Sequence, residues 1–287
     1  MFAKLFENIN VQNGAYTEIF KRLKPLFIQK LKLALSMRTL CPSGRKRNFD
    51  LIEKFFDALY YMMESGAQTK NIKEFFGISK ATFYWYLNWI IDHSFLEIIY
   101  KELIQTLPSS NLLITDSFTV KSMMGSIGLG RNPVDRGRKG LKVSLICDTD
   151  RIVRGVHIGA ANQHDVRLLT DTIEDLPDSH PSELISILCD SGYVGKRIRQ
   201  ECREKNFRLI VKPRKTRKKG KPSHILLKSD MELLKNNRNL IELLNGNIRR
   251  FRGLMIKWVR RIDTYQCFLY LSLLCISCYQ IYVHNNY

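Results

Sequence analysis

The chain has 287 residues, of which 45% are hydrophobic, and this is enough to bury the core of one or two ordinary domains. It carries 46 lysine and arginine residues against 27 aspartate and glutamate residues, which leaves a net charge of +19. Such a charge exceeds what solubility requires and indicates a polyanionic partner, either nucleic acid or an anionic membrane. The acids scattered through the chain argue against a uniformly basic protein of the ribosomal kind.

Neither the cysteines nor the apolar C-terminal run indicates secretion or membrane insertion. Seven widely spaced cysteines in a chain too large to need disulfides predict reduced thiols. Cys275 and Cys278 lack a second pair, which favours core packing over a zinc site. The apolar run 268–283 is short and is interrupted by Gln280 and two serines, which favours a buried helix over a membrane span. Because no secretory signal begins the chain, we expect an intracellular protein with no membrane partner.

Residues 1–105 are expected to form a helical region with a basic linker at 41–47. Within it, Gly77 can supply a left-handed turn residue and Ser79 can cap the helix that follows. This pattern predicts a helix-turn-helix, and an ordinary helical hairpin is the alternative. The expected core is Ile72, Phe76, Ile78, Phe83 and Tyr86. The side chains expected to face a DNA groove are Lys80, Thr82, Tyr84 and Trp85.

In residues 106–287 the sequence pattern changes to short runs rich in residues that favour β-strands. Five strands are predicted, at 112–115, 143–146, 152–158, 184–188 and 207–211. Helices are predicted at 165–176, after Tyr193, and from Asp230 to about Arg250. The resulting order, βββαβαβα, predicts a mixed five-stranded sheet with flanking helices, which is the order of ribonuclease H-like folds. The expected fold class is therefore α/β, with an all-α helix-turn-helix region at 1–105 before a ribonuclease H-like domain at 106–287.

Three acidic residues are candidates for catalysis. Asp116 and Asp190 each follow a predicted strand, where functional residues collect in sheets flanked by helices, although such an aspartate is also a common turn former. Glu242 lies on a predicted helix between Ile241 and Leu243, so we expect it to face inward. Three converging carboxylates repel one another unless cations join them, and two Mg²⁺ ions meet this need. The pattern predicts metal-assisted chemistry on a DNA backbone.

Basic residues accompany these acids. Seven of the ten residues at 212–221 are basic: Lys212, Arg214, Lys215, Arg217, Lys218, Lys219 and Lys221. A solvated loop is the ordinary interpretation of such a run, but its place between two candidate acids favours phosphate binding. Arg238 lies one helical turn before Glu242 and Arg249 nearly two turns after it, so both are expected to reach phosphate.

Taken in order, these motifs resemble those of the DDE transposases of bacterial insertion sequences, specifically insertion-sequence family five. The resemblance covers about residues 41–283. Its three acid motifs are T-D-S at 115–117, D-S-G-Y at 190–193 and R-N-L-I-E at 238–242. K-G-L-K at 139–142 resembles the family's hairpin, and G-A-A-N-Q-H-D at 159–165 resembles its segment before a helix. Lys235 and Arg249 stand where the longer third-acid signature has tyrosine and lysine.

The resemblance implies a transposase that binds the terminal inverted repeats of a mobile element and catalyses Mg²⁺-dependent DNA cleavage and strand transfer, with Mn²⁺ able to substitute. Asp116, Asp190 and Glu242 would be both catalytic residues and metal ligands. Further DNA-binding residues would be Arg138, Lys139 and Lys142. Supporting residues would be His164, Asp165, Tyr193 and Asn239.

The implied partners are double-stranded DNA and at least one further copy of the chain in a synaptic complex. The implied location is the nucleoid in the cytoplasm of a bacterium, or the nucleus of a eukaryotic host. Two alternatives stay open. One is a non-catalytic DNA-binding regulator derived from a transposase, against which the intact acids argue, and the other is a structure-specific nuclease of the same fold.

Overall fold

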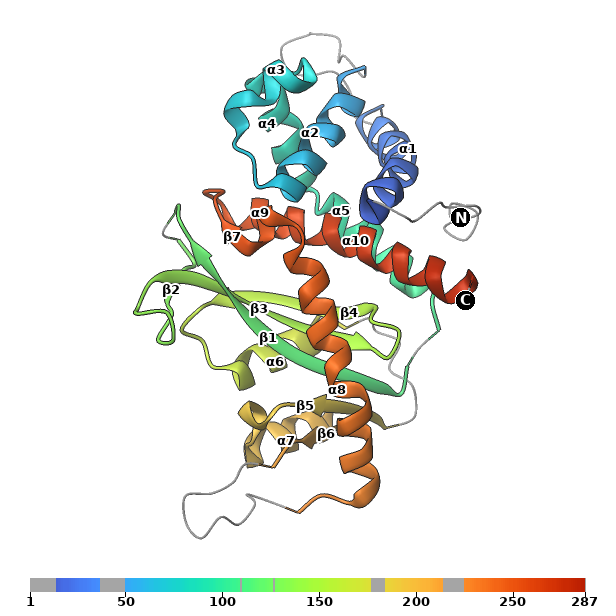
Figure 1. The fold of residues 1–287 in the computed structure, drawn as a ribbon, viewed down its shortest axis with the longest axis vertical. Coiled ribbons are helices and arrows are strands. Elements are labelled where there is room, and N and C mark those ends of the chain that lie inside the picture. The colour runs from blue at the N-terminus through green and yellow to red at the C-terminus, as the bar shows by residue number, and fades with distance from the viewer. Residues whose placement is uncertain are drawn as a thin grey trace. The chain divides into compact units, whose positions relative to one another are not determined.

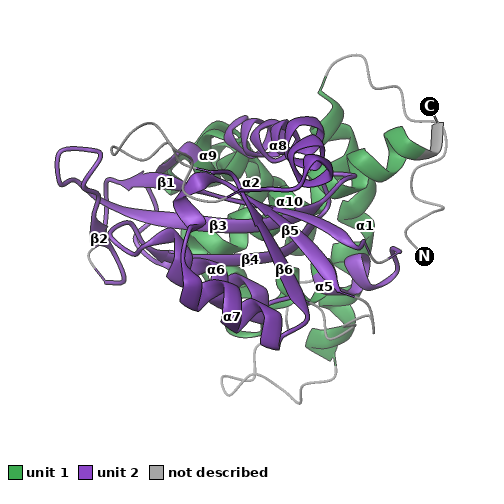
Figure 2. Ribbon diagram, turned by 90° about the horizontal axis from the view of Figure 1, so that it is seen from below, with its two compact units in different colours: residues 1–100, 251–254, 263–287 green, residues 101–250, 255–262 purple. Residues whose placement is uncertain are grey.

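The computed structural model describes residues 14–36, 50–108, 110–125, 127–176, 184–213 and 225–286. The chain divides into two compact units, one helical and one built on a sheet (Figure 2). Unit 1 comprises residues 1–100, 251–254 and 263–287, and unit 2 comprises residues 101–250 and 255–262. The helical unit is therefore discontinuous, and it includes a C-terminal helix that the expected division at 105/106 places with the sheet.

Unit 1 is made of helices from both ends of the chain (Figure 1). Aromatic rings join its first two long helices, because Phe20 stacks on Tyr60 with 4.1 Å between ring centroids. The helices are α1 (Ala15–Ser36), α2 (Leu51–Ser65), η2 (Thr69–Asn71), α3 (Ile72–Phe76), α4 (Lys80–Asp92), α5 (Phe95–Gln105, whose last residues belong to unit 2), α9 (Arg252–Met255) and α10 (Ile262–Asn286).

The predicted helix-turn-helix is formed by α3, Gly77 and α4. Gly77 has φ +63°, and its N–H donates to the carbonyl of Lys73. Ser79 caps α4, because its hydroxyl accepts a hydrogen bond from the N–H of Thr82 at 3.1 Å. The expected core residues Ile72, Ile78, Phe83 and Tyr86 are buried and Phe76 is half-buried. The predicted turn and cap are confirmed.

The apolar C-terminal run forms α10. Of the described helices, it alone is long and apolar enough to cross a membrane by length and composition, and 78% of that stretch is buried inside the protein. Cys275 and Cys278 are buried free thiols within it. The predicted buried helix and the core packing of both cysteines are confirmed.

Unit 2 holds a mixed sheet in the order β2-β3-β1-β5-β6, with β4 beside β3 and β7 beside β1. Three strands are antiparallel: β1 (Leu112–Ser122), β3 (Lys139–Asp148) and β4 (Val153–Ala160). β5 (Ile185–Cys189) and β6 (Phe207–Val211) continue the sheet in parallel to β1. The remaining strands, β2 (Gly130–Arg131) and β7 (Ile256–Lys257), have two residues each. The predicted ribonuclease H-like order is confirmed, with these two short strands added.

Helices cover both faces of this sheet (Figure 2). α6 (Asp165–Glu174) and α7 (Lys196–Glu204) pack on one face, where Leu169, Ile187 and Ile198 belong to one apolar core. α8 (Lys228–Arg249) lies across the other face and contacts β1 and β5. A short turn, η3 (Ser191–Tyr193), follows β5. The carboxyl end of β5 and the facing side of α8 thus border the part of the sheet where the candidate acids lie.

Candidate active site

Two aspartates lie level with each other, one on a strand and one just after the end of the neighbouring parallel strand. β1 and β5 pair with Ile114 opposite Leu188, so Asp116 and Asp190, each two residues farther along, reach the same height. β5 ends at Cys189, and Asp190 begins the loop that follows, as predicted. In open sheets flanked by helices, this carboxyl edge is the usual place for a ligand.

Asp116, in contrast, lies within a strand. β1 continues to Ser122, and Asp116 pairs with Leu145 of β3. The prediction that the strand ends at Thr115 is wrong, because buried residues continue to alternate through Phe118 and Val120. β5 stops beside Asp116, and for this reason the Asp116 side chain can be approached from the carboxyl end of β5.

Helix α8 brings an arginine and a glutamate to these aspartates. A guanidinium nitrogen (Nη2) of Arg238 lies 3.0 Å from a carboxylate oxygen of Asp190, and Nε of Arg238 lies 3.9 Å from Glu242. Asp116, Asp190, Arg238 and Glu242 all line one small pocket. The three predicted acids are thus gathered at one place, with a cation among them.

The orientation of Glu242 differs from the expectation. Its side chain is 64% exposed, at the mouth of the pocket, whereas the preceding Ile241 is buried and the following Leu243 is half exposed. The expected inward orientation is wrong, because residues on an α-helix turn by about 100° per position and apolar neighbours in sequence do not fix the direction of the side chain between them. An exposed carboxylate at a pocket mouth is free to approach a substrate.

Asp116 is a partly buried acid. Burial raises its pKa, the nearby charge of Asp190 raises it further, and a hydrogen bond from the backbone of Ser117 together with Arg238 opposes the shift. Nδ2 of Asn245, one turn after Glu242 on α8, donates to Oδ2 of Asp116 at 3.0 Å. A second cation near Asp116 would therefore favour its ionised form.

An open groove of about 480 Å³ continues from Asp116 along β1. Asp116, Phe118, Glu242 and Arg249 line it, and the guanidinium of Arg249 lies over the Phe118 ring at 5.4 Å from the centroid. Arg249 is nevertheless an exposed residue. Arg249 can therefore meet a phosphate in the same groove that holds two of the acids.

Asp165 holds in place the part of the groove wall that Ser117 and Lys142 form. One of its carboxylate oxygens accepts hydrogen bonds from the Ser117 hydroxyl at 2.7 Å and from the Lys142 ammonium at 2.9 Å. Burial raises the pKa of Asp165, but the Lys142 and Ser117 hydrogen bonds outweigh it, so the pKa lies below its usual value. Lys142 also donates to the carbonyl of Gln163, so its charge is held by the protein rather than presented to solvent.

The other residues expected to support the site have different surroundings. Tyr193 is buried, and its pKa is raised by burial and then by the charges of Asp116 and Asp165. His164 is exposed and caps α6, with Nδ1 accepting from the N–H of Val166 at 3.4 Å. Asn239 is exposed on α8 and lines neither pocket of the acids.

The donor chemistry at this edge fits a hard divalent cation, because carboxylate and amide oxygens are the ligands that Mg²⁺ prefers. Oδ1 of Asn245 is buried and has no hydrogen-bond partner among the described residues, so one oxygen beside Asp116 is unsatisfied. As they stand in the described part of the chain, no three His, Cys, Asp or Glu side chains are close enough together to hold a metal ion. Arg238 supplies the positive charge between the acids instead.

The remaining basic candidates lie on separate elements. Of the run at 212–221, Lys212 is exposed after β6, and the other six, Arg214, Lys215, Arg217, Lys218, Lys219 and Lys221, lie outside the described residues. Arg138 pairs with Asp135 at 3.7 Å, and Lys139 is exposed on β3 opposite Arg131. In unit 1, Lys80, Tyr84 and Trp85 are exposed on α4 and Thr82 is half-buried.

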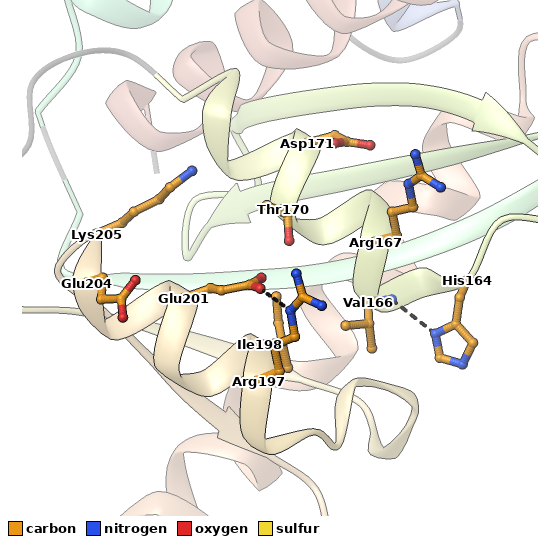
Figure 3. A pocket seen from close by; sticks show the side chains of 10 residues that line it. All are labelled: His164, Val166, Arg167, Thr170, Asp171, Arg197, Ile198, Glu201, Glu204 and Lys205. Carbon is orange, nitrogen blue, oxygen red and sulfur yellow. Dashed lines mark hydrogen bonds and ion pairs between the residues drawn. The ribbon is translucent and has the colours of Figure 1, made fainter.

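A larger groove, of about 1010 Å³, lies between α6 and α7 (Figure 3). The residues that line it include none of the three acids. Its basic side chains Arg167, Arg197 and Lys205 are matched by an equal number of acidic ones, and Arg197 pairs with Glu201 at 2.7 Å. This groove therefore offers a polyanion no net positive charge, and the smaller pockets at the sheet edge are the better candidate.

Two side chains of the site were not singled out by sequence reasoning. Ser117 was noted only as part of a motif, and nothing in the sequence pairs it with Asp165. Asn245 follows Glu242 by three positions, a spacing that puts both on one side of a helix, and this was the signal that could have identified it.

A mixed sheet with aspartates on β1 and after β5, and a glutamate on the helix that crosses them, defines a ribonuclease H-like domain. Residues 108–278 match the family described as "Transposase DDE domain", and the chain belongs to this family. A protein of Burkholderia cepacia named as a transposase for insertion sequence element IS402 is 26% identical over 156 residues, which are 52% of this chain and 68% of that protein.

Among solved structures, the piggyBac transposase synaptic complex with hairpin DNA is similar with a TM-score of 0.54 and 12% identity, over 99% of this chain and 74% of that one. This likeness shows a shared fold. The Mos1 strand transfer complex covers 96% of this chain and 98% of its own with 10% identity, but its TM-score of 0.29 is too low to establish a common arrangement.

Proposed function

We propose that the chain binds the terminal inverted repeats of a mobile element, cleaves the DNA strands at the element's ends and joins them to target DNA. The observation that carries the proposal is that Asp116, on β1, and Asp190, just after β5, lie level while Glu242, from α8, lines the same pocket. Because the chain belongs to the transposase family, DNA cleavage and joining is the class of reaction expected of this pocket.

The groove beside the acids supplies a place for the DNA backbone. Arg249, stacked on Phe118, would bind the DNA phosphate next to the scissile phosphate. The exposed Glu242 would lie near the scissile phosphate on the α8 side. Arg238 would exchange its contact with Asp190 for one with a DNA phosphate. The basic run at 212–221 would add contacts that do not depend on sequence.

Asp116, Asp190 and Glu242 would hold the divalent cations. When bound, two Mg²⁺ ions, or Mn²⁺ in their place, would activate the attacking water or 3′-hydroxyl and stabilise the leaving oxygen. The chain's own part is to keep the carboxylates fixed and partly desolvated: β1 and β5 fix the two aspartates, and Asp165, through Ser117 and Lys142, fixes the wall beside Asp116.

Recognition of the element's ends is assigned to α4 of unit 1, whose exposed Lys80, Tyr84 and Trp85 follow a capped helix start. Joining two ends requires at least two copies of the chain, so the active form would be a dimer or larger. The protein would act where the DNA lies, on the nucleoid of a bacterial host or in a eukaryotic nucleus.

The test is cleavage of a labelled DNA fragment that carries the native element end, with and without Mg²⁺. We expect nicking at the element's boundary that requires Mg²⁺ and is lost in the Asp190→Asn variant. Metal-independent cleavage, or cleavage of any branched DNA irrespective of the end sequence, would favour a structure-specific nuclease. Specific binding without cleavage would favour a DNA-binding regulator. Inverted repeats beside the coding sequence would support the transposase over both.

A further inference from the structure

Asn245 of α8 is placed one helical turn after Glu242 and is only 7% exposed. Its amide nitrogen donates to Oδ2 of Asp116 at 3.0 Å across the space between helix and sheet. The residues around it on the buried side of α8 are apolar, including Ile241, Leu244 and Ile248. A polar side chain at this position is therefore an exception to the packing of the helix.

The other half of the same amide is unsatisfied. Oδ1 of Asn245 is buried and has no hydrogen-bond partner within the described part of the chain. Leaving a buried carbonyl oxygen unpaired is destabilising, and an apolar side chain would avoid this cost. The hydrogen bond to Asp116 accounts for the amide nitrogen but not for the oxygen, which a cation bound beside it would satisfy.

The position of this oxygen points to the kind of ligand. Asn245 lines the 480 Å³ groove together with Asp116 and Glu242, so its buried amide oxygen belongs to a side chain in the wall of the groove that those carboxylates also line. Amide oxygens are common ligands of hard divalent cations. A neutral oxygen also adds a ligand without adding a further negative charge to acids that already repel one another.

We propose that Asn245 has two roles at this site: its amide nitrogen positions Asp116, and its amide oxygen is an additional ligand of the divalent cation held there. The inference rests on the proposed metal-dependent function. The hydrogen bond to Oδ2 orients the Asp116 carboxylate in the wall of the groove that both residues line. Asp116 and Asn245 thus act as a pair joined across β1 and α8.

Binding of Mn²⁺ to the DNA-free full-length chain tests the proposal without depending on activity. Titration calorimetry would compare the parent with Asn245→Leu, which removes both amide groups while keeping the number and branching of side-chain heavy atoms, and with Asn245→Asp, which keeps an oxygen ligand. Asn236→Leu, at an exposed position of the same helix that lines neither acid pocket, is the matched control. Thermal unfolding of each variant is measured in parallel without metal.

We expect Asn245→Leu to weaken Mn²⁺ binding at least tenfold, because both the amide oxygen and the donor to Asp116 are gone. Asn245→Asp keeps an oxygen ligand but loses that donor, so it should bind Mn²⁺ at least several-fold more tightly than Asn245→Leu, and Asn236→Leu should match the parent. Mn²⁺ affinity unchanged in Asn245→Leu would overturn the proposal. Should that variant fail to fold, unchanged affinity in folded Asn245→Ala, which also removes the amide, would overturn it equally.

The two levels of inference fail differently. A parent chain that binds no Mn²⁺ at millimolar concentration would refute the metal-dependent function and the role of Asn245 together. A parent that binds Mn²⁺ through Asp116 and Asp190, as their Asn variants would show, but is indifferent to Asn245→Leu would refute only the role of Asn245.

Discussion

The guanidinium of Arg238 lies 3.0 Å from the carboxylate of Asp190, so a side chain of the protein already holds a position where a metal ion would compete for the same oxygens. We expect Arg238→Gln to strengthen Mn²⁺ binding to the DNA-free chain by about twofold to fivefold, the range that a partly exposed ion pair of up to about 1 kcal/mol allows. The same variant should bind element-end DNA more weakly. Calorimetric titration with Mn²⁺ and then with DNA measures both, and a weaker affinity for Mn²⁺ would contradict the assignment.

Replacing any one of the three acids should abolish chemistry and spare the fold. Asp116→Asn, Asp190→Asn and Glu242→Gln each remove a charge with little change in volume, so strand cleavage should fall on the order of a thousandfold or more. Cleavage of intact ends, strand transfer from pre-cut ends and DNA affinity would be measured for each, with DNA affinity retained. If Glu242→Gln cleaves at nearly the parent rate while Asp165→Asn is inactive, the third carboxylate has been assigned wrongly.

Asp148 offers a matched contrast, because it is a buried acid that serves the fold. Its side chain is 2% exposed, lies 2.7 Å from the Arg154 guanidinium and accepts the N–H of Ile152. Asp148→Asn leaves Arg154 without its counter-charge and should cost about 3–5 kcal/mol in the free energy of unfolding. Urea unfolding would measure this loss, and cleavage per folded molecule should be unchanged. A stable but inactive variant would place Asp148 in the reaction instead.

Side chains on α4 should decide which DNA sequence is bound. Thr82→Ala and Trp85→Ala are expected to weaken binding to the element's end by roughly tenfold to a hundredfold and to leave binding to scrambled DNA nearly unchanged, since base contacts contribute about 1–3 kcal/mol each. Competition assays with both DNAs measure the ratio, and Lys73→Ala on the exposed side of α3 is the control. Equal losses on both DNAs would show that α3 and α4 form an ordinary helical hairpin.

The basic run should contribute affinity without specificity. Lys215, Lys218 and Lys219 lie outside the described residues, and the prediction rests on their charge alone. Their combined replacement by glutamate should reduce the slope of log affinity against log salt by about 3, close to one unit for each lost phosphate contact. Binding measured between low and moderate salt on both specific and random DNA gives this slope. An unchanged slope would mean that the run is a solvated loop.

The parts of the structure that were predicted correctly are those with a local signal. Gly77 and Ser79 predict their turn and cap because each conformation is set by neighbouring backbone groups. The two-residue strands β2 and β7 were missed, since two residues show no alternation. The contact between Ser117 and Asp165 depends on how α6 meets β1, and no periodicity within either segment contains that information.

The same distinction applies to the acids. The order of motifs identifies Asp116, Asp190 and Glu242, and the sheet brings the two aspartates level as the strand predictions imply. The exposure of Glu242 and the ion pair of Arg238 with Asp190 were not foreseeable, because both depend on the rotation of α8 about its own axis. Apolar residues occur on more than one side of α8, so its sequence does not fix that rotation.

The grouping of α10 with the first hundred residues has a consequence for biosynthesis. A ribosome makes the chain from its N-terminus, so every strand and acid of the sheet unit is already synthesised while the 25 residues of α10 are still to come. The nascent helical bundle stays incomplete until α10 has been made. A polypeptide released before α10 would carry all three acids but lack part of the bundle that holds α3 and α4, and recognition of DNA ends would thus mature only after the catalytic residues are in place.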